Sequence, residues 1–69
     1  MKSHNVVQEK SFYAKLTIAY KEARETHYWI RLLISTDYLA AEKGASLLDD
    51  IDELLKIIGS IQRTLRLKN

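Results

Sequence analysis

The chain has 69 residues, no cysteine and a formal net charge of +2. A chain this short buries only about 60% of its unfolded surface, so a single copy is marginally stable. Because disulfides and thiolate metal sites are excluded, oligomerisation is the remaining means of support. Eleven Lys and Arg against nine Asp and Glu exclude the dense positive charge of a dedicated nucleic-acid binder, although contact with nucleic acid is still permitted.

Neither a membrane segment nor a secretion signal is predicted. No apolar run approaches the roughly 18 residues of a membrane span, and the first residues, MKSHNVVQEK, lack the apolar core of a signal peptide. The mixture of 46% hydrophobic and 29% charged residues is typical of a folded domain. We therefore expect a soluble protein of a bacterial-type cytoplasm, without a membrane partner.

Residues 1–10 are polar apart from two valines, and two interpretations of them remain open. They form either a frayed leader or the first turns of the helix that follows. In the first case the hydroxyl of Ser11 caps the helix; in the second the helix begins near Asn5 and Ser11 lies inside it.

Residues 11–35 are predicted to form one long helix with apolar side chains on two sides. The main stripe has His27 and Ile34 at its edge and comprises Phe12, Leu16, Ala19, Ala23, Thr26, Ile30 and Leu33. A second group, Ile18, Trp29 and Leu32, lies nearly opposite and is flanked by Tyr28. Since a monomeric hairpin would leave this group in water, Ile18, Tyr28, Trp29 and Leu32 are the candidate oligomer interface.

Residues 36–45 are predicted to be a loop in which Gly44 supplies the permissive backbone of a turn. Ser46 is the expected N-cap of a second helix over residues 46–67, with Asp49 completing a capping-box-like pattern. This helix carries one apolar stripe, with Leu48 beside it: Leu47, Ile51, Leu54, Leu55, Ile58, Ile61 and Leu65. Gly59 lies off the stripe and marks either a close backbone approach or a tolerated defect.

The sequence contains no recognisable catalytic or metal-binding pattern. A di-iron bundle needs Glu-x-x-His, but Arg24 stands three residues before His27, and Glu25 and His27 point about 200° apart on a helix. Phosphate-binding loops, nucleophile elbows and zinc-protease motifs are absent from the sequence. We therefore expect no enzymatic activity, no catalytic residue, no metal, no cofactor and no small-molecule substrate.

Contact with RNA or DNA is a separate possibility, and two interpretations of the basic residues remain open. Basic side chains interleave with aromatic ones on the long helix and close the second helix, and an oligomer would repeat them into a basic surface. The alternative is a solvated helix face with interface aromatics. The candidate nucleic-acid contacts are Lys21, Arg24, Arg31, Arg63, Arg66 and Lys68.

The long helix resembles a known family. The run KSFYAKLTIAYKEARETHYWIRLL, Lys10 to Leu33, is similar to the third helix of the bacterial four-helix-bundle proteins of 23S rRNA intervening sequences. KEARETHYW, Lys21 to Trp29, is the most specific part. The loop Thr36-Asp37-Tyr38-Leu39 and the final Leu/Ile-rich helix ending in Asn69 are similar as well. Members of the family have two further helices before this point, so this chain resembles only their C-terminal helical hairpin.

The resemblance implies a homo-oligomeric protein without enzymatic activity. It also implies relatives that assist the reverse transcriptases of retroelements by binding protein and nucleic acid. No defined binding residue carries over, because Glu22, Glu25, Tyr28 and Trp29 match the family's motif in what looks like a structural role.

Together, these observations predict an all-α protein, an antiparallel two-helix hairpin that completes a four-helix bundle by self-association. The expected partner is a second copy in a homodimer or higher oligomer. The expected function is that of a structural or assembly module, and the alternative is an RNA- or DNA-binding accessory protein.

Overall fold

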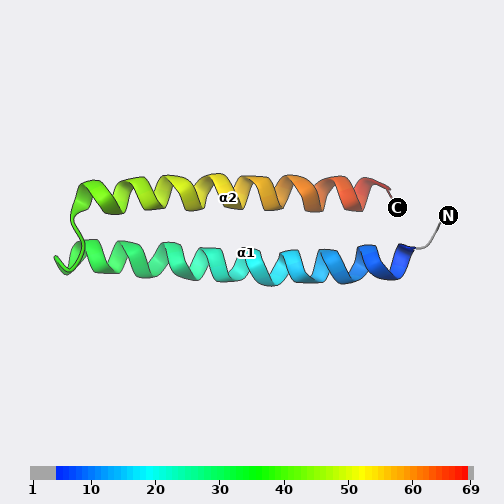
Figure 1. The fold of residues 1–69 in the computed structure, drawn as a ribbon, viewed down its shortest axis with the longest axis horizontal. Coiled ribbons are helices and arrows are strands. Elements are labelled where there is room, and N and C mark those ends of the chain that lie inside the picture. The colour runs from blue at the N-terminus through cyan, green and yellow to red at the C-terminus, as the bar shows by residue number, and fades with distance from the viewer. Residues whose placement is uncertain (1–4, 69) are drawn as a thin grey trace.

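A computed structural model describes residues 5–68, with side chains from Gln8 onwards. Two helices, α1 (Asn5–Ser35) and α2 (Ala41–Lys68), run antiparallel and side by side along their lengths (Figure 1). Residues 36–40 connect them at one end, and both termini lie at the other. The Cα atoms span 53 × 15 × 15 Å, a rod one hairpin thick. The prediction of an all-α antiparallel hairpin is therefore confirmed.

The long helix begins at Asn5, the earlier of the two starts that the sequence left open. Ser11 accordingly lies inside α1 and does not cap it. Residues 1–4 of the predicted leader, and Asn69 at the other end of the chain, lie outside the described residues.

A Schellman motif ends α1. The backbone N–H of Tyr38 donates to the carbonyl of Leu33 over 2.9 Å, and that of Asp37 donates to the carbonyl of Ile34 over 3.1 Å. Asp37 has a φ of 65°, the left-handed conformation that this motif requires and that Asp tolerates better than most residues. The chain therefore reverses within a few residues of the last helical turn.

The structure corrects the prediction that Gly44 is a turn residue and Ser46 an N-cap. α2 begins at Ala41, five residues before Ser46, and the N–H of Gly44 donates to the carbonyl of Ala40 over 2.9 Å. Gly44 is buried and does not have a positive φ. A Cβ at this position would overlap Ile34 Cδ1 and lie 2.5 Å from Ile34 Cγ1. Gly44 therefore leaves room for the Ile34 side chain of α1 and does not form a turn.

The contact between the helices follows a heptad repeat. On both helices the buried and half-buried positions recur at alternating spacings of three and four, the pattern of coiled-coil a and d residues. The a positions are Tyr13, Tyr20, His27 and Ile34 on α1, and Leu48, Leu55 and Gln62 on α2. The d positions are Glu9, Leu16, Ala23 and Ile30 on α1, and Gly44, Ile51, Ile58 and Leu65 on α2.

The predicted apolar stripes are thus only partly correct as a description of the hairpin core. Ala23, Ile30 and Ile58 are buried, but Phe12 remains 48% exposed and Leu54 47% exposed. The physical reason is width: a single partner helix covers only the a and d positions, whereas the stripes also include the g position that precedes each a residue. The g residues of both stripes therefore stay largely exposed in the hairpin.

The two glycines provide a test of this packing. No atom lies within 4 Å of a Cβ built on Gly59, so Gly59→Ala should stabilise the protein by about 0.5–1 kcal/mol through helix propensity and raise its Tm by several degrees. Gly44→Ala gains the same propensity but collides with Ile34, so its Tm should not rise. Thermal unfolding followed by circular dichroism at one protein concentration compares the two. Equal stabilisation by both substitutions would contradict the close approach at Gly44.

Candidate interaction faces

The two sides of the helix–helix seam differ in chemistry because the hairpin is antiparallel. A two-fold operation relates antiparallel helices, so the g positions of both lie along one side of the seam and the e positions along the other. The described residues can therefore be assigned to two opposite faces.

The g side is apolar, and we call it the apolar face. Its central residues carry no charge on either helix and are exposed, or half-buried in the case of Ile61. The apolar face comprises Phe12, Ala19, Thr26 and Leu33 on α1, and Leu47, Leu54 and Ile61 on α2. Trp29 and Ile57, at the adjacent c positions, flank it and are also exposed.

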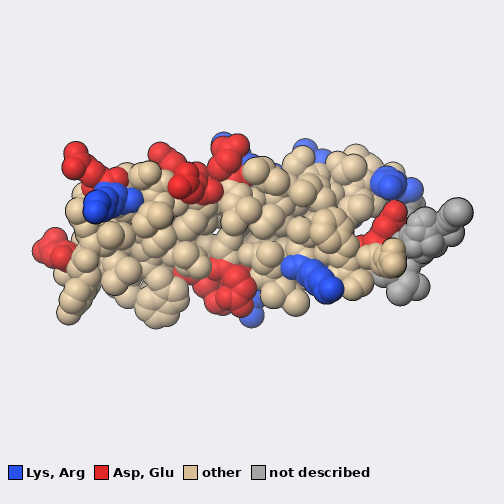
Figure 2. Space-filling view, in the orientation of Figure 1, with Lys and Arg blue, Asp and Glu red and all other residues tan. Residues whose placement is uncertain are grey.

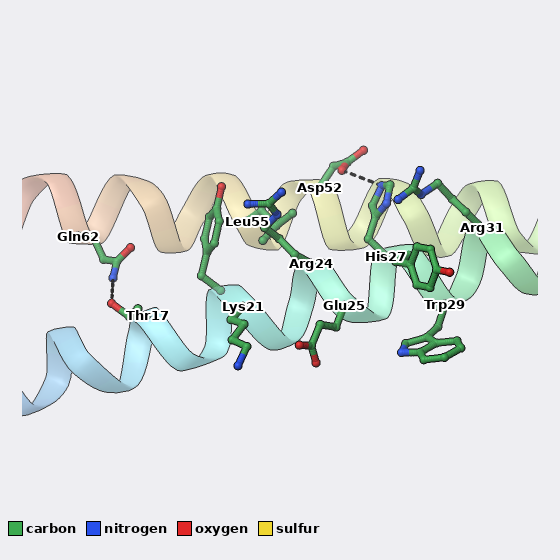
Figure 3. Close-up of a pocket in the computed structure, with 12 residues that line it drawn as sticks. Thr17, Lys21, Arg24, Glu25, His27, Trp29, Arg31, Asp52, Leu55 and Gln62 are labelled. Atoms are coloured by element: carbon green, nitrogen blue, oxygen red, sulfur yellow. Dashed lines mark hydrogen bonds and ion pairs between the residues drawn. The ribbon is translucent and has the colours of Figure 1, made fainter.

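The distribution of charge over the molecule agrees with this assignment. Figure 2 shows a face on which an uncharged band follows the seam, while the Lys, Arg, Asp and Glu side chains lie mostly along the outer edges and the ends. The close-up in Figure 3 places the N-terminal part of α1 on the left, whereas Figures 1 and 2 place it on the right, with α2 above in each. Figure 3 therefore views the hairpin from behind the face shown in Figure 2, and the groove that it draws lies on the side of the seam opposite the apolar face.

The e side is polar, and hydrogen bonds between the helices cross it. Gln62 Nε2 donates to Thr17 Oγ1 over 2.8 Å and to the Tyr13 carbonyl over 3.4 Å. Arg66 Nη1 donates to Tyr13 Oη over 2.9 Å. His27 Nε2 lies 3.3 Å from Asp52 Oδ1, an ion pair when the imidazole is protonated. These contacts fix the register of α2 against α1 on this side.

A shallow groove follows the same side, and we call it the basic groove (Figure 3). Arg24, His27 and Arg31 point from α1 towards α2, whereas Lys21, Glu25 and Trp29 project from α1 away from α2 (Figure 3). The full lining is Thr17, Tyr20, Lys21, Arg24, Glu25, His27, Tyr28, Trp29, Arg31, Asp52, Leu55 and Gln62.

An aromatic and cationic cluster occupies the end of the groove nearest the interhelical connection. The rings of Tyr28 and Trp29 meet edge to face, with centroids 5.3 Å apart and planes at 70°. The Arg31 guanidinium carbon lies 5.9 Å from the centroid of the Tyr28 ring, within the range of a cation–π contact. Guanidinium, ammonium and phenol groups donate hydrogen bonds and favour anionic ligands such as phosphates.

The four residues predicted to form the oligomer interface are exposed, but they do not gather on one face. Tyr28 lines the basic groove, and Trp29 stands between the groove and the apolar face. Ile18 and Leu32 share the outer f position of α1, and Glu25 lies midway between them on the same line. The sequence-based set therefore mixes residues of three different surfaces.

The predicted nucleic-acid contacts are likewise divided. Lys21, Arg24 and Arg31 come together in the basic groove. Arg66 lies further along the same side beside Tyr13, and Arg63 precedes it by one helical turn. Lys68, at a g position, instead forms an ion pair with Glu9 over 3.4 Å.

Sequence reasoning did not place Tyr20, Asp52 or Gln62 at the groove. Their membership depends on the register between the helices, in which His27 meets Asp52 and Thr17 meets Gln62. The heptad spacing of half-buried polar residues on both helices was the available signal, because polar a positions often set the register of a coiled coil.

Two further properties concern only residues 5–68. Among them, no group of three or more His, Cys, Asp or Glu side chains is arranged to hold a metal ion. Neither helix in this range is long and apolar enough to cross a membrane.

Comparison with known proteins gave one match. The family model of the 23S rRNA-intervening sequence protein matches residues 2–60 of the chain. No curated protein and no solved structure matches it.

Proposed function

The chain belongs to the 23S rRNA-intervening sequence protein family, and on that premise we propose that it is a structural assembly module that completes a four-helix bundle with a second copy of itself. The family consists of small helical proteins without an assigned catalytic activity. The apolar face is the observation that carries the proposal.

The exposed area of the hairpin supports a partner of this size. Its accessible surface is 5429 Å². Surface scaling gives about 4,450 Å² for a compact monomer of this mass and about 3,700 Å² per chain for a compact dimer. Dimerisation would therefore bury about 1,700 Å² per chain, an amount typical of obligate homodimers.

The chemistry of the apolar face supports a second copy as the occupant. Two copies placed face to face would bring only uncharged side chains to the centre of the interface, so no charge would lose its hydration without compensation. Glu9 and Lys68, the charged residues at the open end of this side, already neutralise each other within one chain. The packing would also cover the g positions, which the hairpin alone leaves exposed, as in a four-helix bundle.

Three arginine substitutions on α2 test the proposal. Leu54→Arg places a charge on the apolar face and should convert the dimer to monomer and lower the Tm. Ile58→Arg, at a residue 5% exposed within the hairpin, should abolish folding altogether. Ser60→Arg adds the same side chain at an exposed position on the outer side of α2 and should leave both properties unchanged.

Light scattering coupled to gel filtration gives the mass, and circular dichroism gives the Tm. If Leu54→Arg and Ser60→Arg had the same mass and Tm as the unaltered protein, the apolar face would not be the interface.

A second pair of substitutions separates the rim of the proposed interface from the outer side of α1. Trp29, 57% exposed beside the apolar face, would lose part of its surface in the dimer, whereas Ile18, 60% exposed, would remain in water. Trp29→Glu should therefore raise the dimer Kd about tenfold or more, and Ile18→Glu should change it less than threefold. Sedimentation equilibrium measures both constants. The reverse order would favour an interface on the outer side of α1.

Nucleic-acid binding is the second candidate function, favoured by the three cations of the basic groove. Arg24 and Arg31 lie on the same side of α1, seven residues apart, and the groove lining sets the three cations against two carboxylates, Glu25 and Asp52. The groove therefore offers two guanidinium groups to a phosphate backbone with a small excess of positive charge.

Charge reversal in the groove tests this candidate. Arg24→Glu combined with Arg31→Glu should weaken binding of a single-stranded oligonucleotide at least tenfold at about 50 mM salt and flatten its salt dependence. The matched control is Lys10→Glu with Lys56→Glu, which removes two cations that neither line the groove nor flank the apolar face and should have a smaller effect. Fluorescence anisotropy provides the Kd. Equal losses in the two variants would mean that binding depends on net charge and not on the groove.

A further inference from the structure

We propose that the self-associated protein carries two identical basic grooves on opposite outer sides and bridges two segments of single-stranded nucleic acid. This inference rests on the proposed dimer. It adds to that proposal the ligand, the number of sites and their relative orientation.

The orientation follows from the arrangement of the two faces on one hairpin. The apolar face consists of g positions, and the contacts that define the groove side come from a and e positions across the seam. Burying the apolar face in the centre of a dimer therefore turns the groove outwards. Any two-fold arrangement of two such hairpins places the second groove on the opposite side, whichever way the helices of the two copies run.

The distance between the two basic grooves of the dimer excludes a single combined site. Packed helices lie about 8–10 Å apart and are about 10–12 Å across, so the outer sides of two stacked hairpins lie about 20 Å apart. A short oligonucleotide in one groove cannot contact the other without passing around the bundle. Each groove is thus an independent site, and one dimer holds two strands.

The composition of the groove favours single strands over duplexes. Tyr28 is more than half exposed at the end of the groove, where its ring meets Trp29 edge to face and lies 5.9 Å from the Arg31 guanidinium carbon. Exposed aromatic rings beside guanidinium groups bind unpaired bases by stacking and phosphates by charge. In a duplex the base faces are covered, so only the phosphate contacts would remain.

A bridging experiment tests the inference with the full chain. One decanucleotide, U10 or dT10, is immobilised, and a fluorescent copy of the same oligonucleotide is added with or without the protein at about 50 mM salt. The protein should capture the fluorescent strand, with two strands per dimer at saturation. Parallel arms with U10 and dT10 distinguish RNA from DNA, and a 10-base-pair duplex should be captured at least tenfold less well.

Two variants and one control separate the parts of the inference. Leu54→Arg should still bind one fluorescent strand but lose at least nine-tenths of the bridging signal. Arg24→Glu with Arg31→Glu should remain dimeric and lose both binding and bridging. The control, Lys10→Glu with Lys56→Glu, should bridge nearly as well as the unaltered protein.

Light scattering on the same samples distinguishes the possible failures. A monomeric unaltered protein would overturn the proposed dimer and the bridging with it. A dimer that binds one strand, binds none, or captures the duplex as well as the single strand would overturn the bridging inference while the proposed dimer stands. Undiminished bridging by Leu54→Arg would show that the apolar face does not hold the two grooves together.

Discussion

The structure depends on one geometric constraint: a helix can cover only a narrow strip of another helix. In this hairpin each helix covers the a and d positions of its partner, and little else is removed from water. Among the described side chains of the apolar core, only Ala23, Ile30 and Ile58 are buried. Large apolar residues at the g positions, Phe12, Leu33, Leu47 and Leu54, stay exposed on one side, which is the side that the proposed dimer would cover.

The same constraint separates two kinds of surface. Because the helices are antiparallel, the apolar g residues of both gather on one side, and the polar e residues gather on the other. Thr17, Asp52 and Arg66 then bond across the seam, where they fix the register, and Arg24 and Arg31 line the groove above it. One heptad pattern thus provides an apolar surface, where we propose self-association, and a polar surface of different chemistry on the other side of the seam.

The sequence was sufficient for the fold because the signals for it are local. Two stripes of helical periodicity, separated by a loop predicted over residues 36–45, indicated two antiparallel helices. The assignment of faces was less accurate. Periodicity gave the direction of the wide stripe, but which part of it the partner helix covers depends on the interhelical register, set by contacts such as that between Gln62 and Thr17.

Gly44 illustrates the same limit. In sequence, a glycine near a predicted break favours a turn. In the structure Gly44 lies inside α2 against Ile34. The residue with a left-handed backbone is Asp37, which was predicted only to lie in the loop. A glycine in a turn and a glycine inside a helix that packs against Ile34 are distinguished by their tertiary contacts. Those contacts cannot be read from a single sequence.

We propose that a second copy of the chain covers the apolar face. Sedimentation equilibrium of the unaltered protein over a range of micromolar concentrations tests this dimer. The expected result is a folded species with twice the 8.0 kDa chain mass and a population of monomer that grows on dilution. A helical species of 8.0 kDa, stable and monomeric throughout that range, would contradict it.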